Sequence, residues 1–311
     1  MSVGLVVNSY ERTYRDVLRP GFFSGIVAQN LRPLDEVVAL INNVDDVDDA
    51  RDRAESLVRD GEITSYALVS DHIDEALAGA KLSRRVLRVR PYLLDYGLVM
   101  PRVVATDWLV GWDAETRLSA PTNWIDPAID LLEDDLRVLH VSLNWPPARA
   151  GDAGLEGDVV GWVGDFALSW GFSDQLFLLR RHDLLGPIYR SFSPAAIARH
   201  APHPYTFEFR VESFQRATGR FRATLSTVSY QTNQNLGGVL VRTGESSWDA
   251  VSRKALHRLE HSVTRRLPPW IGPRFARNSA PAFGRAPTKG RVPFASARST
   301  RGVEPEGGAS A

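Results

Sequence analysis

The chain has 311 residues, 43% of them hydrophobic and 24% charged, a composition typical of a globular protein that buries one large core or two modest ones. Its 37 basic and 37 acidic side chains cancel, so the chain as a whole has no general attraction for nucleic acid or anionic lipid. It contains no cysteine, which excludes disulfides, thiolate metal sites and cysteine nucleophiles and favours a reducing, cytoplasmic location.

The opening residues and the apolar runs favour the same location. The sequence MSVGLVVNSYERTYR lacks the basic, apolar and cleavage regions of a secretory signal. No uninterrupted apolar run approaches the roughly 18 residues that suggest a membrane span. We therefore expect a cytoplasmic protein with no transmembrane segment.

Strands and helices are predicted to alternate in the first part of the chain. Short β-branched runs at 3–8 and 36–42 predict buried parallel strands, and 19–31 between them has the apolar spacing of a helix. The alternation continues with a helix at 50–59, a strand at 65–70 and a helix at 73–80. This order is typical of an α/β domain with a parallel sheet.

The rest of the chain divides into further elements and a tail. The predicted elements are a strand at 103–112, a helix at 124–132, a strand at 138–143, an aromatic and apolar stretch at 159–179, a helix at 206–220, a strand at 221–230 and an amphipathic helix at 242–266. Beyond these, proline, glycine, alanine, serine and arginine dominate, and 265–311 holds nine basic and two acidic side chains. We therefore expect one domain over 1–266 and a flexible basic tail over 267–311.

Two acidic residues follow the strand predicted at 103–112. Side chains two positions apart point the same way along a strand, so Asp113 and Glu115 lie on one side if the strand persists through them. The carboxyl ends of strands line the ligand crevice in open α/β sheets, and neighbouring carboxylates suit Mg²⁺ or Mn²⁺. The alternative interpretation is a solvated turn after a buried strand.

The order of these features resembles the GT-A glycosyltransferases, particularly the broad family 2 group, over residues 3–235. The resemblance rests on the sequence NSYER at 8–12, the strand EVVALINN at 36–43 followed by Asp45 and Asp46, and the segment WLVGWDAE at 108–115. It implies a GT-A-like (Rossmann-like), mostly parallel sheet flanked by helices. It also implies transfer of a sugar from a nucleotide-diphosphate donor to a hydroxyl acceptor, with Mn²⁺ or Mg²⁺ stabilising the leaving diphosphate.

Carried over by position, the resemblance implies a set of binding residues. The expected nucleotide-sugar contacts are Ser9, Tyr10 and Arg12 in the first loop, Asn43 and Asp45 after the second strand, and Asp71 after the third. Asp113 and Glu115 take the place of the family's metal-binding D-x-D motif. Simpler interpretations stay open, because Ser9 and Asp71 also suit helix caps, and asparagine and aspartate suit ordinary turns.

Two acids compete for the catalytic role that the resemblance implies. Glu208 in YTFEFR has the downstream position of the carboxylate base in inverting family members, although Phe209 stands where a partner aspartate is usual. Asp174 in the triplet SDQ is similar to a residue beside the reacting sugar in some retaining GT-A enzymes. Inversion and retention both stay open. Each acid also suits a structural role, Asp174 as a helix cap and Glu208 in a surface ion pair.

Two other functions compete with a glycosyltransferase. A nucleotidyltransferase uses a related sheet and metal but normally opens with a glycine-rich basic loop, whereas residues 8–12 hold no glycine. The other is a non-catalytic nucleotide-sugar-binding protein. The acceptor stays open between a glycan, a lipid-linked glycan and modified nucleic acid. The basic tail suits contact with a polyanion or a membrane surface, or has only a solubilising role.

Overall fold

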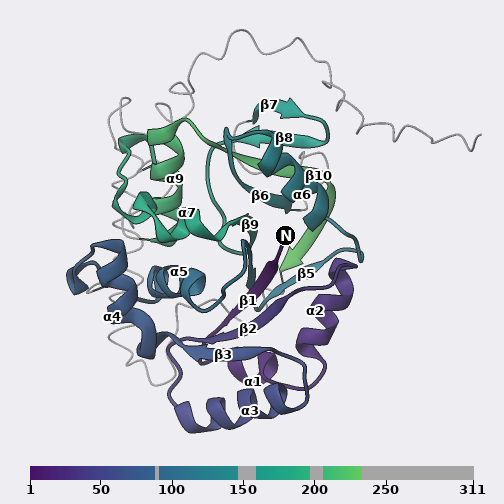
Figure 1. The fold of residues 1–311 in the computed structure, drawn as a ribbon, viewed down its shortest axis with the longest axis vertical. Helices are drawn as coiled ribbons and strands as arrows, with labels where there is room; N and C mark the ends of the chain where they lie inside the picture. Colours follow the sequence, from purple (N-terminus) through teal and green to yellow (C-terminus); the bar gives the residue numbers. More distant parts are fainter. Residues whose placement is uncertain (88–90, 146–158, 197–205, 233–311) are drawn as a thin grey trace, which may run out of the picture.

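The computed structural model describes residues 1–87, 91–145, 159–196 and 206–232. These residues form one large sheet with helices on both of its faces (Figure 1). The α/β class predicted from the sequence is therefore confirmed. The helix predicted at 242–266, the tail predicted at 267–311 and the domain boundary between them lie outside the described residues.

Four parallel strands form one half of the sheet. They are β1 (Val3–Ser9), β2 (Glu36–Ile41), β3 (Ser65–Leu68) and β4 (Trp108–Asp113), in the spatial order β3-β2-β1-β4. The central strands are buried on both faces, which is why they read as nearly continuous apolar runs. The chain adds strands on one side of β1 and then returns to its other side, which places a topological switch point between β1 and β4.

Antiparallel pairing enters beyond β4. The remaining strands are β5 (Thr116–Leu118), β6 (Val138–Asn144), β7 (Val159–Val163), β8 (Phe166–Ser169), β9 (Leu176–Arg180) and β10 (Phe221–Thr232). β9 runs antiparallel between β4 and β6, whereas β10 is parallel to β6. β10 also pairs antiparallel with β8 and β5, and β7 pairs antiparallel with β8. The expected parallel arrangement thus holds for the first four strands and for β6 with β10.

Helices enclose an apolar core on each face of the sheet. They are α1 (Tyr14–Val17), α2 (Phe22–Asn30), α3 (Val47–Arg59), α4 (Val69–Ala80), α5 (Asp95–Val99), α6 (Ile125–Asp134), α7 (Arg181–Leu185) and α9 (Phe207–Thr218). α1, α2, α3 and α6 pack with Leu5 and Val7, whereas α4, α5, α7 and α9 pack with Val6, because successive side chains of a strand face opposite ways. None of the helices in the described ranges is long and apolar enough to cross a membrane.

The segments 81–87 and 91–102, for which the sequence predicts no element, cover the carboxyl ends of the parallel strands. Short 3₁₀ helices surround α5 there, and a fourth follows α7; they are η1 (Arg84–Leu87), η2 (Pro91–Leu93), η3 (Met100–Arg102) and η4 (Pro187–Arg190). Such short turns have no recurring apolar period, so periodicity does not reveal them.

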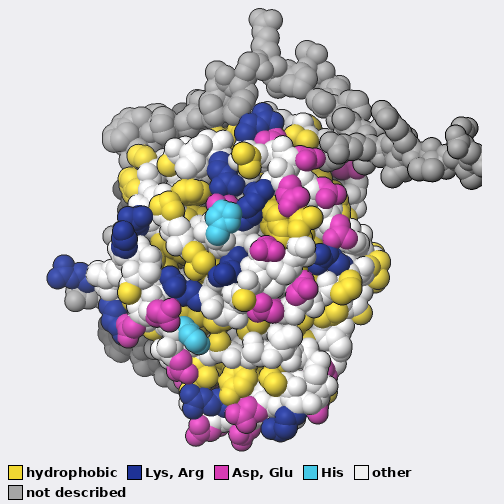
Figure 2. All heavy atoms as spheres, viewed as in Figure 1, with side chains coloured by type: hydrophobic (Ala, Val, Ile, Leu, Met, Phe, Trp, Pro, Cys, Tyr) yellow, Lys and Arg dark blue, Asp and Glu magenta, His cyan; other side chains and the backbone are white. Residues whose placement is uncertain are grey.

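The described surface in Figure 2 mixes both signs of charge. Basic and acidic side chains alternate over this face, and neither sign forms a continuous field across it. A surface of this kind gives no general attraction for a polyanion. The polyanion or membrane contact predicted from the sequence belongs to 267–311 and lies outside the described residues.

Candidate functional site

Two cavities open at the carboxyl ends of the parallel strands. The first has a volume of about 80 Å³ and is lined by residues at or just after the carboxyl ends of β1, β2 and β4. The second has a volume of about 540 Å³ and is lined by residues at the ends of β2 and β3. Asn42 and Asn43 line both, so the two cavities share a wall, and we call the pair the crevice. Open α/β sheets bind their ligands at this edge, next to the switch point.

Asp113 is the last residue of β4 and lines the first cavity. Burial raises the pKa of its carboxyl to about 7, and the nearby carboxylates of Asp174 and Glu115 contribute in the same direction. Carboxylates brought this close repel one another, and a bound cation relieves that repulsion. The structure therefore places Asp113, as expected, at the carboxyl end of a strand and in the wall of the crevice.

Glu115 lies close to Asp113 because of a turn and not because of a continuous strand. β4 ends at Asp113, and Ala114 and Glu115 form a turn, so the strand does not persist through both acids and that premise is wrong. The turn nevertheless keeps them together, because the Glu115 amide donates to Asp113 Oδ1 at 2.8 Å. The Glu115 carboxylate accepts a hydrogen bond from the Tyr10 hydroxyl at 3.2 Å, and burial with the charges of both acids raises the pKa of Tyr10.

Asp174 lies beside Asp113 in the wall of the first cavity. The Asp113 amide donates to the Gln175 carbonyl at 2.8 Å, which fastens the loop before β9 to the end of β4. Asp174 Oδ2 accepts a hydrogen bond from the hydroxyl of Tyr96, a residue of α5. Because a strand follows Asp174, the alternative role of a helix cap is excluded.

Glu208 approaches the same phenol from another helix. It lies in the first turn of α9, where Thr206 caps the helix by accepting a hydrogen bond from Phe209 N at 3.0 Å. Burial raises the pKa of the Tyr96 hydroxyl, followed by the charge of Asp174, and the charges of Glu208 and Asp113 add to the rise. Asp174 therefore contacts Tyr96 directly, whereas Glu208 acts on the same phenol through its charge and lines neither cavity.

Two of the three contact residues expected in the first loop line the first cavity. Tyr10 and Arg12 line the first cavity. Ser9 does not, because it is fully buried and its hydroxyl donates to the Leu40 carbonyl at 3.2 Å. The expected ligand contact of Ser9 is therefore corrected to a structural link between β1 and β2.

Of the three residues expected after β2 and β3, only Asn43 lines the crevice. Asn43 has a left-handed backbone with φ of 47°, which asparagine tolerates better than most residues. Asp45 and Asp71 are exposed and line neither cavity, so their expected contact with the nucleotide stays a prediction. Asp71 stands in the first turn of α4, where negative charge is favourable, and lies 3.6 Å from Arg51.

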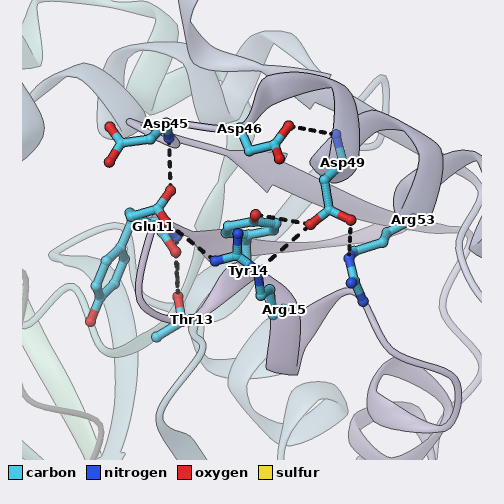
Figure 3. A network of polar contacts seen from close by, with 9 residues as sticks. Glu11, Thr13, Tyr14, Arg15, Asp45, Asp46, Asp49 and Arg53 are labelled. Atoms are coloured by element: carbon cyan, nitrogen blue, oxygen red, sulfur yellow. Dashed lines mark hydrogen bonds and ion pairs between the residues drawn. The ribbon is translucent and has the colours of Figure 1, made fainter. Parts of the chain in front are cut away.

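Glu11, which the sequence does not single out, joins the loops that follow β1 and β2 (Figure 3). Its Oε2 accepts a hydrogen bond from Asp45 N at 2.7 Å, and its Oε1 accepts one from Arg15 at 3.2 Å. Figure 3 also shows that Tyr14, Arg15 and Arg53 converge on Asp49 of α3. Glu11 lines the first cavity as well, so this network fixes the spacing of the loops around it.

Sequence reasoning also missed Asn8, Asn42, Asp95 and Tyr96 as residues of the crevice. Asn8 and Asn42 stand at or just after the ends of β1 and β2, so the rule that selected Asp113 at the end of β4 selects them too. Asp95 and Tyr96 belong to a helix of five residues, which leaves no periodic pattern to find. Only the fold brings that helix to the crevice.

The residues around Asp113 fit a divalent cation that arrives with phosphate. Across the described ranges, no three histidine, cysteine, aspartate or glutamate side chains converge to hold an ion by themselves. Asn8, which pairs with Asp113 in the β-ladder, has a buried Oδ1 with no hydrogen-bond partner within the described part of the chain. Mg²⁺ and Mn²⁺ take oxygen ligands, and Mg²⁺ usually binds through one or two carboxylates together with phosphate and water. Asp113 and Asn8 supply such a partial set.

Comparison with known proteins finds similarity to solved structures only. No family model matches the chain, and no curated protein matches it. GalNAc-T7, solved with UDP, GalNAc and Mn²⁺, is similar with a TM-score of 0.45 and 11% identity, over 75% of this chain and 44% of that one. The chain thus spans less than half the length of that protein.

Two further similar structures have smaller TM-scores. The mannosyltransferase PcManGT from Pyrobaculum calidifontis, in complex with GDP-Man and Mn²⁺, has a TM-score of 0.40 and 16% identity over 89% of this chain and 68% of that one. Glucosyl-3-phosphoglycerate synthase from Mycobacterium tuberculosis, in complex with Mn²⁺, UDP-glucose and phosphoglyceric acid, has a TM-score of 0.37 and 13% identity over 75% of this chain and 71% of that one.

Proposed function

We propose that the protein transfers a sugar from a nucleotide-diphosphate donor to a hydroxyl acceptor, with a divalent cation on the diphosphate. The observation that carries the proposal is the position of Asp113. It ends a strand beside the switch point, lines a cavity, and has two further carboxylates next to it. This arrangement of oxygen ligands suits a cation between protein and phosphate.

The first cavity takes the diphosphate in this proposal. Asp113 and Asn8 would hold the cation, which would supply positive charge against the negative charge that grows on the leaving diphosphate. Arg12 lines the same cavity and adds a guanidinium, which suits phosphate oxygens. Glu115, the other expected metal ligand, keeps Tyr10 in place through its hydrogen bond and would add a second negative charge for the cation.

The second cavity takes the nucleoside. Its wall is largely aliphatic, with Val44, Leu68 and Ile73 among its residues, and the Asn42 and Asn43 amides provide polar groups. An apolar pocket with a few placed polar groups is the usual environment of a base and its ribose. In this proposal one nucleotide extends past Asn42 and Asn43 from the second cavity to the first.

The two acids around Tyr96 divide the chemistry. Asp174, in the cavity wall, stands beside the sugar, where its charge stabilises positive character at the anomeric carbon. Glu208, beyond Tyr96, takes the proton of the acceptor hydroxyl as general base, which makes the reaction inverting. The acceptor is a hydroxyl compound that approaches from the side of α9.

The test is incubation of the full chain with Mn²⁺ and a panel of UDP-, GDP- and TDP-sugars. Release of the nucleoside diphosphate in the presence of cation, or slow donor hydrolysis without an acceptor, supports the proposal. Release of pyrophosphate from a nucleoside triphosphate and sugar phosphate supports the nucleotidyltransferase instead. Nucleotide binding without turnover identifies the non-catalytic alternative.

Loss of the Glu11 network is expected to weaken donor binding more than catalysis. Glu11→Ala removes the acceptor of Asp45 N, so we expect the free energy of unfolding to fall by about 1 kcal/mol and the donor KM to rise several-fold. The turnover number stays nearly unchanged. Urea unfolding and steady-state kinetics measure both effects.

Glu62→Ala is the matched control for this variant. Glu62 also accepts a backbone N–H, from Gly21 at 2.7 Å, but lines neither cavity. It should lose comparable stability and keep the donor KM. An equal rise of KM in both variants would contradict a specific role for Glu11.

A further inference from the structure

α5 is a helix of only five residues that packs against α4 and α9 (Figure 1). Its first two residues, Asp95 and Tyr96, are 5% and 6% exposed. They form hydrogen bonds with different parts of the crevice. Asp95 contacts the wall that the two cavities share, and Tyr96 contacts the acid in the wall of the first cavity.

Asp95 fixes the orientation of the two amides in the shared wall. Its Oδ1 accepts hydrogen bonds from Asn42 Nδ2 at 2.9 Å and from Tyr96 N at 2.7 Å. Its Oδ2 accepts one from Asn43 Nδ2 at 3.3 Å, and the same nitrogen donates to Asn42 Oδ1 at 2.7 Å. Because an ionised carboxylate only accepts, both amides must turn a nitrogen toward Asp95.

The contact with Asp95 leaves the side-chain oxygen of Asn43 as an available acceptor. With its nitrogen committed to Asp95 and Asn42, its Oδ1 accepts no hydrogen bond from the residues that the structure describes. This oxygen belongs to a residue that lines both cavities. Asp95 therefore leaves the shared wall with an acceptor available to the N–H or O–H group of a ligand.

Tyr96 fixes the orientation of Asp174. Its hydroxyl donates to Asp174 Oδ2, and its ring packs edge-on against Phe207, with ring centroids 5.6 Å apart. The buried ring has little freedom, so it holds one carboxylate oxygen toward α5. The loop of Asp174 is separately fastened to β4 through Gln175, and the two attachments together define where the carboxylate stands.

We propose that Asp95 and Tyr96 are positioning residues with separate tasks, Asp95 orienting the amides that contact the nucleoside and Tyr96 orienting Asp174 for the transfer step. The nucleoside contact given to the two amides and the catalytic role given to Asp174 rest on the proposed function. Because the residues are adjacent in one buried helix, they set the nucleotide-binding wall and the catalytic carboxylate at a fixed spacing.

Kinetics of two single variants separate the tasks. Asp95→Asn replaces an acceptor by an amide, so the Asn42 and Asn43 amides lose their common partner. We expect about a tenfold rise in donor KM with little change in kcat. Tyr96→Phe removes only a hydroxyl, and we expect kcat to fall by about tenfold to a hundredfold with donor KM unchanged, because the lost hydrogen bond is to a charged group.

Tyr189→Phe is the control that distinguishes positioning of Asp174 by Tyr96 from a merely structural role of Tyr96. Tyr189 is also buried, its ring stacks on the same Phe207, and its hydroxyl donates to the Gly97 carbonyl of the same helix. It lines neither cavity. We expect it to lose thermal stability as Tyr96→Phe does and to keep both kinetic constants. Equal kinetic losses in the two tyrosine variants overturn the role of Tyr96.

A second measurement keeps this inference separate from the proposed function. Side-chain amide signals of Asn42 and Asn43 in ¹⁵N NMR should move in Asp95→Asn. The carboxyl carbon signal of Asp174 should move in Tyr96→Phe and not in Tyr189→Phe. If no donor is turned over but these signals move as stated, the proposed function fails and the positioning stands. If transfer is found but the NMR signals do not move as stated, the positioning fails. It also fails if Asp95→Asn and Tyr96→Phe change KM and kcat in the same way.

Discussion

Asp113→Asn is expected to lower the rate of sugar transfer by about a thousandfold or more and, without metal, to make the folded protein more stable at about pH 8. The loss of rate follows from the loss of a charged oxygen at the cation. Asparagine keeps the size of the side chain and an oxygen that accepts the Glu115 N–H, so the turn after β4 is retained. Steady-state kinetics with saturating Mn²⁺ measure the first effect.

The gain in stability follows from the direction of the pKa shift. The pKa of Asp113 is about 7 in the folded protein against an ordinary value of 3.8. Between these values the folded protein binds a proton that the unfolded chain releases, so stability falls as the pH rises from about 4 to 7. Above that range the folded protein holds an unfavourable charge. Its removal should raise the free energy of unfolding by about 1–2 kcal/mol, measured by urea unfolding in EDTA.

Asp107→Asn is the control from the opposite end of the same strand. Asp107 precedes β4, and hydrogen bonds from the Ser2 amide and hydroxyl lower its pKa. Its stabilising contribution is present above its ordinary pKa and is lost in acid, which is the reverse of Asp113. The control should keep its turnover and become slightly less stable at about pH 8. A rate loss as large as that of Asp113→Asn would contradict a special role for the carboxyl end of β4.

Glu208→Gln is expected to lower transfer by about a hundredfold to ten-thousandfold while leaving donor affinity unchanged, because a general base acts on the acceptor hydroxyl and not on the nucleotide. Glutamine is isosteric and keeps α9 capped by Thr206. Glu208→Asp keeps the charge and should recover part of the rate. Transfer kinetics with a saturating donor, and donor affinity by calorimetry, measure the two quantities.

Comparison with Asp174→Asn distinguishes the two acids. Asp174 lines the cavity beside Asp113, so its loss should lower slow donor hydrolysis as well as transfer, whereas loss of Glu208 should lower transfer selectively. The anomeric configuration of the product, read by proton NMR, should be inverted. A retained configuration, or full transfer activity in Glu208→Gln, would contradict the assignment of the base.

The sequence predicts the elements of this fold well wherever they have a clear period. The runs at 3–8 and 36–42 are β1 and β2, and the strand predicted at 103–112 becomes β4, which begins at Trp108 and ends at Asp113. Strand direction is harder, because pairing between distant segments leaves no local signal. β9 runs antiparallel to both of its neighbours, β4 and β6, although its apolar run looks like those of the parallel strands β1 and β2.

The site is less predictable than the fold, because contacts between segments distant in the sequence leave no local signal. Strand ends are visible in the sequence, so Asp113 and Asn43 are found in advance. Asp95 and Tyr96 come from a short helix, and only the packing of that helix reveals them. Ser9 shows the opposite failure, because a polar residue at a strand end has its partner in the neighbouring strand and not in the cavity.

The most direct test of a cation held at Asp113 is the affinity of the full chain for UDP and GDP with Mn²⁺ and with EDTA, in the wild type and in Asp113→Asn. Mn²⁺ should strengthen binding of at least one of these nucleotides by about tenfold or more in the wild type and have little effect in the variant. Equal affinity with and without the cation in the wild type, or the same gain in both proteins, would contradict a cation held at Asp113.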